Sequence, residues 1–207
     1  EQPKRKGIGY FLIDLRSPGI DVRELRHMGG VVDFNEVWLD KVRVPHDQLV
    51  GAAQDGWRVA ASTLAGERQM VAGSGSGGVD RIGGVGADRL VDQIRDREDH
   101  PALADRAVAL WSEDRIRGWT NQRVRATVTA GGTPGPAASI GKVQQAALNQ
   151  GIQLAATDML RSAAMAWDGD DWVASKPYEV SGMIRSRANT IEGGTTEVNK
   201  NVIGEKV

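Results

Sequence analysis

The segment from residue 186 to residue 198 combines a break between two helical patterns with groups that can bind a polar ligand. Gly193 and Gly194 interrupt the first pattern, and Thr195 or Thr196 can cap the helix that follows. Backbone N–H groups that such a break leaves free, next to a helix N-terminus, suit an anion or a carbonyl oxygen. The alternative is a plain junction, because two glycines followed by a threonine are most often a helix C-cap that meets an N-cap.

Glu67 is the residue that we single out for acid–base chemistry. It lies on a predicted helical stripe that otherwise holds Leu64, Met70 and Val71. A carboxylate among apolar neighbours loses solvation, so we expect its pKa to rise toward neutrality and to suit a general base. The alternative is that Glu67 lies at the edge of the stripe and pairs with a cation, which is the commoner position of a helical glutamate.

Composition excludes several other kinds of chemistry. The 207 residues contain no cysteine, which rules out disulfides, thiolate zinc sites and cysteine nucleophiles. His27, His46 and His100 lie far apart in the sequence, so we expect neither a metal site nor a Ser-His triad. With 26 Lys and Arg against 27 Asp and Glu, nothing suggests a nucleic-acid or membrane partner, and no apolar run approaches a bilayer span. We therefore expect a cytoplasmic protein.

The elements that must position these residues change type along the chain. Runs rich in valine and aromatic residues predict strands at 8–15 and within 31–45. From Asp55 onward the apolar period is helical, and we predict helices over 55–71, 102–128 and 137–160, then helices on both sides of the two glycines. Trp111 and Trp119 are predicted core residues. The fold class is therefore mainly α (α+β): a short antiparallel β segment followed by an antiparallel helical bundle.

Two blocks near opposite ends of the chain are similar to one protein family. Residues 33–45 read DFNEVWLDKVRVP and are followed by LVG at 49–51 and DGW at 55–57, while residues 191–195 read IEGGT. In this order the blocks resemble acyl-CoA dehydrogenases, in which the first leads out of a β-domain and the second opens the last helix. The resemblance implies that residues 1–54 are the C-terminal part of an incomplete β-domain and that residues 55–207 are the C-terminal helical bundle domain.

The resemblance also implies roles for individual residues. Members of the family carry a catalytic glutamate at one of two positions. Glu67 matches the first and Gly193 falls on the second, so Glu67 is the implied base, with Glu192, one residue early, as the alternative. Arg68 would help to place the substrate or the glutamate, and the N–H of Gly193 would bind the thioester carbonyl oxygen. The positions that contact FAD in relatives match Gly194, Thr195 and Glu197.

The implied function is α,β-desaturation of an acyl-CoA thioester in lipid metabolism, with FAD as the cofactor and electron-transfer flavoprotein as the acceptor. A glutamate would remove the α-proton, and a hydride would pass from the β-carbon to the flavin. The family's RxxFG-like and QxxGG-like flavin motifs have no match at 88–101 and 163–171, so we expect residues 1–207 alone to be inactive. A second hypothesis stays open, a non-catalytic subunit that assembles with a competent acyl-CoA dehydrogenase. We expect a homodimer, a homotetramer or a heteromer with a related subunit.

Overall fold

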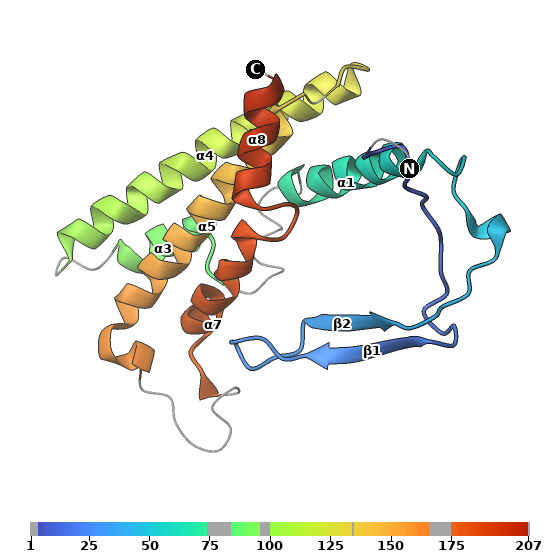
Figure 1. The fold of residues 1–207 in the computed structure, drawn as a ribbon. Coiled ribbons are helices and arrows are strands. Elements are labelled where there is room, and N and C mark those ends of the chain that lie inside the picture. Colours follow the sequence, from blue (N-terminus) through green and yellow to red (C-terminus); the bar gives the residue numbers. More distant parts are fainter. Residues whose placement is uncertain (1–3, 74–83, 96–99, 134, 166–174, 207) are drawn as a thin grey trace. The chain divides into compact units, whose positions relative to one another are not determined.

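The computed structural model describes residues 4–73, 84–95, 100–133, 135–165 and 175–206. The chain divides into two compact units, Glu1–Gly66 and Glu67–Val207, and helix α1 (Gly56–Gly73) runs across the division (Figure 1). A short antiparallel sheet precedes a set of helices, which confirms the predicted fold class. Of the helices in the described ranges, none is both long enough and apolar enough to cross a membrane.

The first unit holds a two-stranded antiparallel sheet. Strand β1 (Ile20–Leu25) pairs with strand β2 (Phe34–Leu39), and Ile20 lies opposite Leu39. A short 3-10 helix, η1 (His46–Gln48), follows the sheet. β2 confirms the strand predicted within 31–45. β1 lies outside the predicted strands because half of its six residues are charged, which weakens the apolar pattern that indicates a strand.

The strand predicted at 8–15 is wrong. This segment forms only an isolated antiparallel bridge between Phe11 and Leu49, beside which the Leu12 N–H donates to the Gln48 carbonyl oxygen at 3.0 Å. An apolar run becomes a strand only where a neighbouring strand supplies a ladder of backbone hydrogen bonds. Within the described part of the chain, no strand continues that ladder beyond the bridge.

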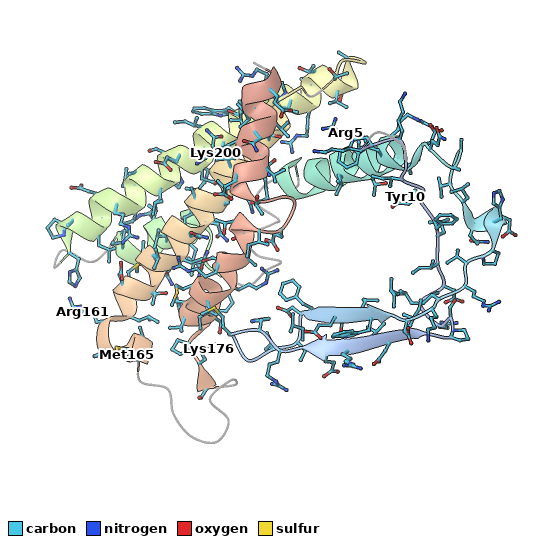
Figure 2. The ribbon with its side chains drawn as sticks, in the orientation of Figure 1. Arg5, Tyr10, Arg161, Met165, Lys176 and Lys200 are labelled. Atoms are coloured by element: carbon cyan, nitrogen blue, oxygen red, sulfur yellow. The ribbon has the colours of Figure 1, made fainter. Side chains whose placement is uncertain are left out.

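Helix α1 begins directly after Asp55, as the change of apolar period predicts. The Asp55 carboxylate accepts a hydrogen bond from Arg58 Nη2 at 2.9 Å, and this bond lowers the pKa of the Asp55 carboxyl. Arg5 lies beside the helix (Figure 2), with its guanidinium carbon 5.0 Å from the centroid of a Trp57 ring. This distance is typical of a cation–π contact, which ties the start of the described chain to the first turn of α1.

The second unit is a helical bundle with α5 at its centre. Its long helices α4 (Pro101–Thr129) and α5 (Ala137–Leu160) lie side by side. α5 also contacts the shorter helices α3, α7 and α8 and the 3-10 helices η2 and η3 of this unit (Figure 1). α4 and α5 confirm the helices predicted at 102–128 and 137–160, with Pro101 at the first turn of α4. The elements of this unit are α3 (Ala87–Ile94), α4 (Pro101–Thr129), α5 (Ala137–Leu160), η2 (Arg161–Met165), α7 (Tyr178–Arg185), η3 (Ser186–Thr190) and α8 (Thr196–Lys206).

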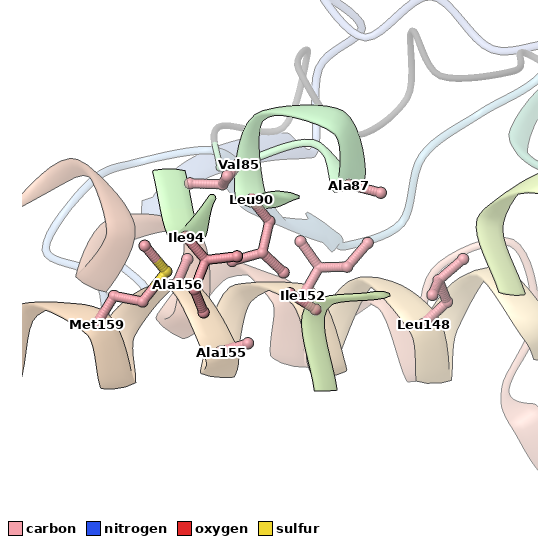
Figure 3. Packing of buried hydrophobic residues seen from close by; sticks show 10 residues of the cluster. Val85, Ala87, Leu90, Ile94, Leu148, Ile152, Ala155, Ala156 and Met159 are labelled. Atoms are coloured by element: carbon pink, nitrogen blue, oxygen red, sulfur yellow. The ribbon is translucent and has the colours of Figure 1, made fainter. Parts of the chain in front are cut away.

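The apolar core of the bundle lies between α3 and α5. Figure 3 shows Leu90 and Ile94 of α3 above Ile152 and Ala156 of α5, and all four side chains are at most 4% exposed. Small side chains on α5 let the two helices approach closely. α3 lies outside the predicted helices, although its apolar residues have the spacing of four that indicates one buried helical face.

The prediction that Trp111 and Trp119 are core residues is wrong. Trp111 is 36% exposed and Trp119 is 64% exposed. The side of α4 that faces the bundle is occupied by Ala107, Arg117 and Asn121, which are buried. Trp119 lies on the other side of the helix, roughly half a helical turn away from Arg117 and Asn121. Trp111 lies at the edge of the buried side, four residues after Ala107, where its Nε1 donates to Asp88 Oδ1 of α3 at 2.7 Å.

Two helical glycines provide a test of the close packing around α5. A Cβ atom at Gly182 would lie 2.6 Å from Gln153 Oε1 and 2.7 Å from Gly84 Cα, whereas a Cβ at Gly118 would meet no atom within 4 Å. We expect Gly182→Ala to lower the free energy of unfolding by about 1–3 kcal/mol through overpacking. Gly118→Ala is the matched control and should raise the free energy of unfolding by about 0.5–1 kcal/mol. Urea unfolding of both variants measures the difference, and equal stability of the two would contradict the packing.

Candidate functional site

The glycine turn (residues 191–195) connects η3 to α8. Gly193 and Gly194 have φ angles of +64° and +89°, a backbone region that favours glycine. The Thr195 hydroxyl oxygen accepts a hydrogen bond from the Val198 N–H at 3.2 Å, which makes Thr195 the N-cap of α8. Of the two threonines that could cap this helix, the structure therefore selects Thr195.

Two N–H groups of the glycine turn can bind a ligand. Among the described residues, neither the Gly193 N–H nor the Gly194 N–H has an acceptor. Asn199 Nδ2 holds the other side of the turn, because it donates to the Gly194 and Thr195 carbonyl oxygens at 3.0 Å each. Two donors beside a helix N-terminus suit a carbonyl or anionic oxygen, as the sequence predicts.

Asn199 also presents an unused acceptor. Its side chain is 0% exposed, and its Oδ1 has no hydrogen-bond partner within the described ranges. A buried polar atom without a partner is unfavourable by about 1–3 kcal/mol, so it calls for a partner such as a bound water, ion or ligand. Asn199, which holds the carbonyl side of the turn, therefore carries one acceptor that no described residue uses.

Glu192 lies at the start of the turn and is held from two sides. Its Oε2 accepts a hydrogen bond from Arg185 Nη2 at 3.1 Å, and its Oε1 accepts one from Asn189 Nδ2. The Glu192 side chain is 28% exposed and that of Arg185 is 16% exposed. We call these three residues the Glu192 clamp. Both carboxylate oxygens of the alternative base are thus engaged by donors from the protein.

A buried chain of side-chain amides connects the clamp to the core, and we call Asn189, Asn149 and Gln153 the amide ladder. Asn149 Nδ2 donates to Asn189 Oδ1 at 2.6 Å, and Gln153 Nε2 donates to Asn149 Oδ1 at 2.9 Å. Gln153 also binds the backbone of Val85 twice: its Oε1 accepts from the N–H at 2.9 Å and its Nε2 donates to the carbonyl at 2.8 Å. The three ladder side chains are at most 1% exposed.

Lys142 is a buried cation under the same turn. It is 1% exposed, and its Nζ donates to the Asn189 carbonyl oxygen. Burial lowers the pKa of Lys142 below its ordinary value of 10.5, and the negative charge of Glu192 offsets part of this change. The clamp and Lys142 together place two cations, Arg185 and Lys142, around one carboxylate.

The structure brings some of the predicted site residues together. Glu192, Gly193, Gly194 and Thr195 lie in the glycine turn, and Glu197 lies exposed in the first turn of α8. Glu67 and Arg68 are neighbours on α1, but their side chains lie outside the part of the chain that the structure describes. The described residues contain no group of His, Asp and Glu that could hold a metal ion.

Sequence reasoning missed the residues that support the turn. These are Lys142, Asn149, Gln153, Arg185, Asn189 and Asn199. The signal for two of them was present, since Asn149 and Gln153 are four residues apart on α5, next to the apolar Ile152 and Ala156, and must share one face. Polar residues at that spacing inside an apolar pattern indicate a buried network rather than a solvent face.

Comparisons with known proteins agree on one family. The family model described as "Acyl-CoA dehydrogenase, C-terminal domain" matches residues 54–207. The acyl-CoA dehydrogenase FadE34 of Mycobacterium tuberculosis is 33% identical over 208 residues, an alignment that covers 100% of this chain and 27% of that protein.

Solved structures share the fold. A structure described as the Tcur3481-Tcur3483 steroid ACAD aligns with a TM-score of 0.79 and 22% identity, over 99% of this chain and 52% of that one. The FAD complex of PigA aligns with a TM-score of 0.75 and 16% identity, over 95% of this chain and 51% of that one. The chain therefore spans about half of the solved chains, and about a quarter of FadE34.

The buried cation gives a pH dependence that can be measured. Because the pKa of Lys142 is lower in the folded protein than in the unfolded chain, the unfolded chain binds more protons between these two values. We therefore expect the free energy of unfolding to rise with pH from the folded-state pKa up to about 10.5, and Lys142→Met to remove this rise. Urea unfolding across that range measures it. Lys200→Met, at an exposed lysine of α8, is the matched control. The same pH dependence in both variants would rule out Lys142 as its source.

Proposed function

The chain belongs to the acyl-CoA dehydrogenase family, and we propose that it is the C-terminal part of a flavin-dependent enzyme that desaturates an acyl-CoA thioester between its α and β carbons. The observation that carries the proposal is the pair of N–H groups at Gly193 and Gly194, which have no acceptor among the described residues and lie beside the N-terminus of α8. Such donors stabilise negative charge that develops on a thioester oxygen when an α-proton is removed.

Glu67 is the proposed base. It lies on α1, within the residues that match the family's C-terminal domain, and as a carboxylate it can take the α-proton. Glu192 is less suited to this step, because both of its carboxylate oxygens accept hydrogen bonds from the Glu192 clamp. Arg68 follows Glu67 on the helix, and we propose that it helps to place the substrate or the glutamate.

The proposed cofactor is FAD, which when bound accepts the hydride that leaves the β-carbon. The polar groups around the glycine turn fit such a group, because Asn199 Oδ1 and the glycine N–H donors have no partners among the described residues. Thr195 and Glu197, at the start of α8, would hold the flavin together with the Gly194 backbone. The FAD complex of PigA shares the fold, which supports the same cofactor here.

Glu67→Gln tests the proposed base in the whole polypeptide that contains these residues. We expect the wild-type protein to bind a flavin. The flavin absorbance should bleach on addition of at least one of three test thioesters: hexanoyl-CoA, isovaleryl-CoA or the CoA thioester of a steroid side chain. Glu67→Gln should retain the flavin and slow bleaching about 10²–10⁴-fold, since the α-proton loses its acceptor. Glu113→Gln, at an exposed residue of α4, is the matched control. Wild-type bleaching rates in Glu67→Gln would refute the assignment.

Assembly with a second subunit is proposed through α4. Its outer side carries Val108, Ile116 and Trp119, which are 53%, 51% and 64% exposed. Several large apolar side chains exposed on one side of a helix suit a protein–protein contact. The same surface favours the second function, a non-catalytic subunit paired with a competent dehydrogenase. Electron-transfer flavoprotein is the proposed acceptor, and the family resemblance is its support.

Trp119→Glu tests this surface. A charge at Trp119, the most exposed of these apolar residues, should disfavour burial against a partner. We therefore expect the wild-type polypeptide to be a dimer or larger and the variant to dissociate at least about tenfold more readily. Sedimentation equilibrium measures the masses, with Thr129→Glu at the exposed end of α4 as the control. A flavin-free protein that oligomerises only with a related subunit would support the non-catalytic function. Unchanged assembly of Trp119→Glu would exclude this face.

A further inference from the structure

Glu192 anchors the glycine turn to the residues before it. Glu192 lies next to Gly193 in the chain, and its carboxylate is fixed by Arg185 Nη2 and Asn189 Nδ2. The Glu192 N–H also donates to the Ala188 carbonyl oxygen at 2.9 Å, so both the backbone and the side chain of this residue are tied down. The direction of the next N–H, that of Gly193, is therefore set by how Glu192 is held.

The clamp does not move independently of the core. Asn189 is 0% exposed and continues into the amide ladder through Asn149, whose Nδ2 is 2.6 Å from Asn189 Oδ1. Gln150 Nε2 adds a bond to the Ser186 carbonyl oxygen at 3.2 Å. α5 is thus connected to η3 at more than one point, and a rigid helix determines the geometry of the glycine turn.

Two cations lie around the Glu192 carboxylate. Arg185 pairs with it at 3.1 Å, and the buried Lys142 interacts with it electrostatically. Because both carboxylate oxygens already accept hydrogen bonds from the protein, the side chain is a fixed anchor.

We propose that Glu192 is a positioning residue: the Glu192 clamp, supported by the amide ladder, holds the glycine turn so that the Gly193 N–H meets the thioester oxygen. This inference rests on the proposed function and names the residues that make its oxygen site effective. Glu192 acts through the turn and does not itself touch the reacting atoms. A displacement of about 1 Å in such a site can slow a reaction about 10²-fold, so the anchor has a measurable effect.

The test uses the infrared stretching frequency of a ¹³C-labelled thioester carbonyl bound to the flavin-loaded polypeptide. A hydrogen bond to the oxygen lowers this frequency, so it reports on the donor and not on overall stability. The probes are the three test thioesters with the label at the carbonyl carbon. Glu192→Gln preserves the size of the side chain but replaces one acceptor with a donor that faces Arg185 or Asn189, which breaks the clamp.

We expect the wild-type protein to lower the carbonyl frequency and Glu192→Gln to return it toward the value of the free thioester. The kcat should fall about 10–10²-fold, with the flavin content and the midpoint of the pH profile unchanged. Glu205→Gln, at an exposed residue of α8, is the matched control and should leave all four quantities at their wild-type values.

Two results would overturn the inference. The first is a wild-type carbonyl frequency and kcat in Glu192→Gln. The second is a wild-type frequency combined with loss of α-proton exchange in deuterium oxide, which would make Glu192 the base. Failure of the proposed function would give a different result. In that case the wild-type protein would not lower the carbonyl frequency, and its flavin would not bleach with any of the test thioesters.

A second variant keeps the test decisive if Glu192→Gln does not fold. Arg185→Gln removes the ion pair at Glu192 Oε2 and leaves the Asn189 bond to Oε1 in place. We expect a frequency between those of the wild type and the free thioester, and Arg185→Lys should restore part of the shift because it keeps the positive charge. A wild-type frequency in Arg185→Gln would overturn the clamp as the anchor of the turn.

Discussion

The amide ladder is the interaction on which the rest of the bundle depends. Gln153 is 0% exposed and binds both the N–H and the carbonyl oxygen of Val85, which lies 68 residues earlier in the chain. Without this side chain, two buried backbone groups would lack partners, which is unfavourable by about 1–3 kcal/mol for each. The close approach also requires glycine at 84 and 182, because a Cβ at either position would lie 2.6 Å from Gln153 Oε1.

The same ladder explains how charged groups are accommodated beside the glycine turn. Lys142 and Asn189 are both at most 1% exposed, and the Lys142 ammonium donates to the Asn189 backbone oxygen. Burial of a lone cation is strongly unfavourable, and a network of hydrogen bonds and an opposite charge reduces that penalty. Glu192 supplies the opposite charge, and Arg185 completes its hydrogen bonding. The polar groups under the turn therefore stabilise one another as a set.

Apolar surface remains exposed in both units. In the first unit, Phe34 and Trp38 of β2 are 37% and 56% exposed, and in the second the outer side of α4 carries Ile116 and Trp119. An isolated two-stranded sheet is only marginally stable in water, and apolar faces of this kind usually pack against further protein. The chain spans about a quarter of FadE34 and about half of the solved chains that it matches.

The sequence by itself determined the local features of this protein. The periods of α4 and α5, a threonine cap at 195 or 196 and the break at Gly193 and Gly194 depend on neighbours within a few residues, and each is visible in the amino-acid pattern. The family could likewise be identified from two short blocks. The segment at 8–15 shows the limit of this reasoning, because an apolar run becomes a strand only when a distant partner pairs with it.

Only the tertiary structure decided which side chains support the glycine turn. Asn149 and Asn189 are 40 residues apart in the sequence, and their contact depends on how α5 packs against η3. The outward position of Trp119 likewise depends on which side of α4 faces the bundle, and a helix with apolar residues on two sides does not reveal that choice. The physical reason is the same in both cases: helical periodicity is local, whereas the pairing of buried faces is set by the packing of the whole bundle.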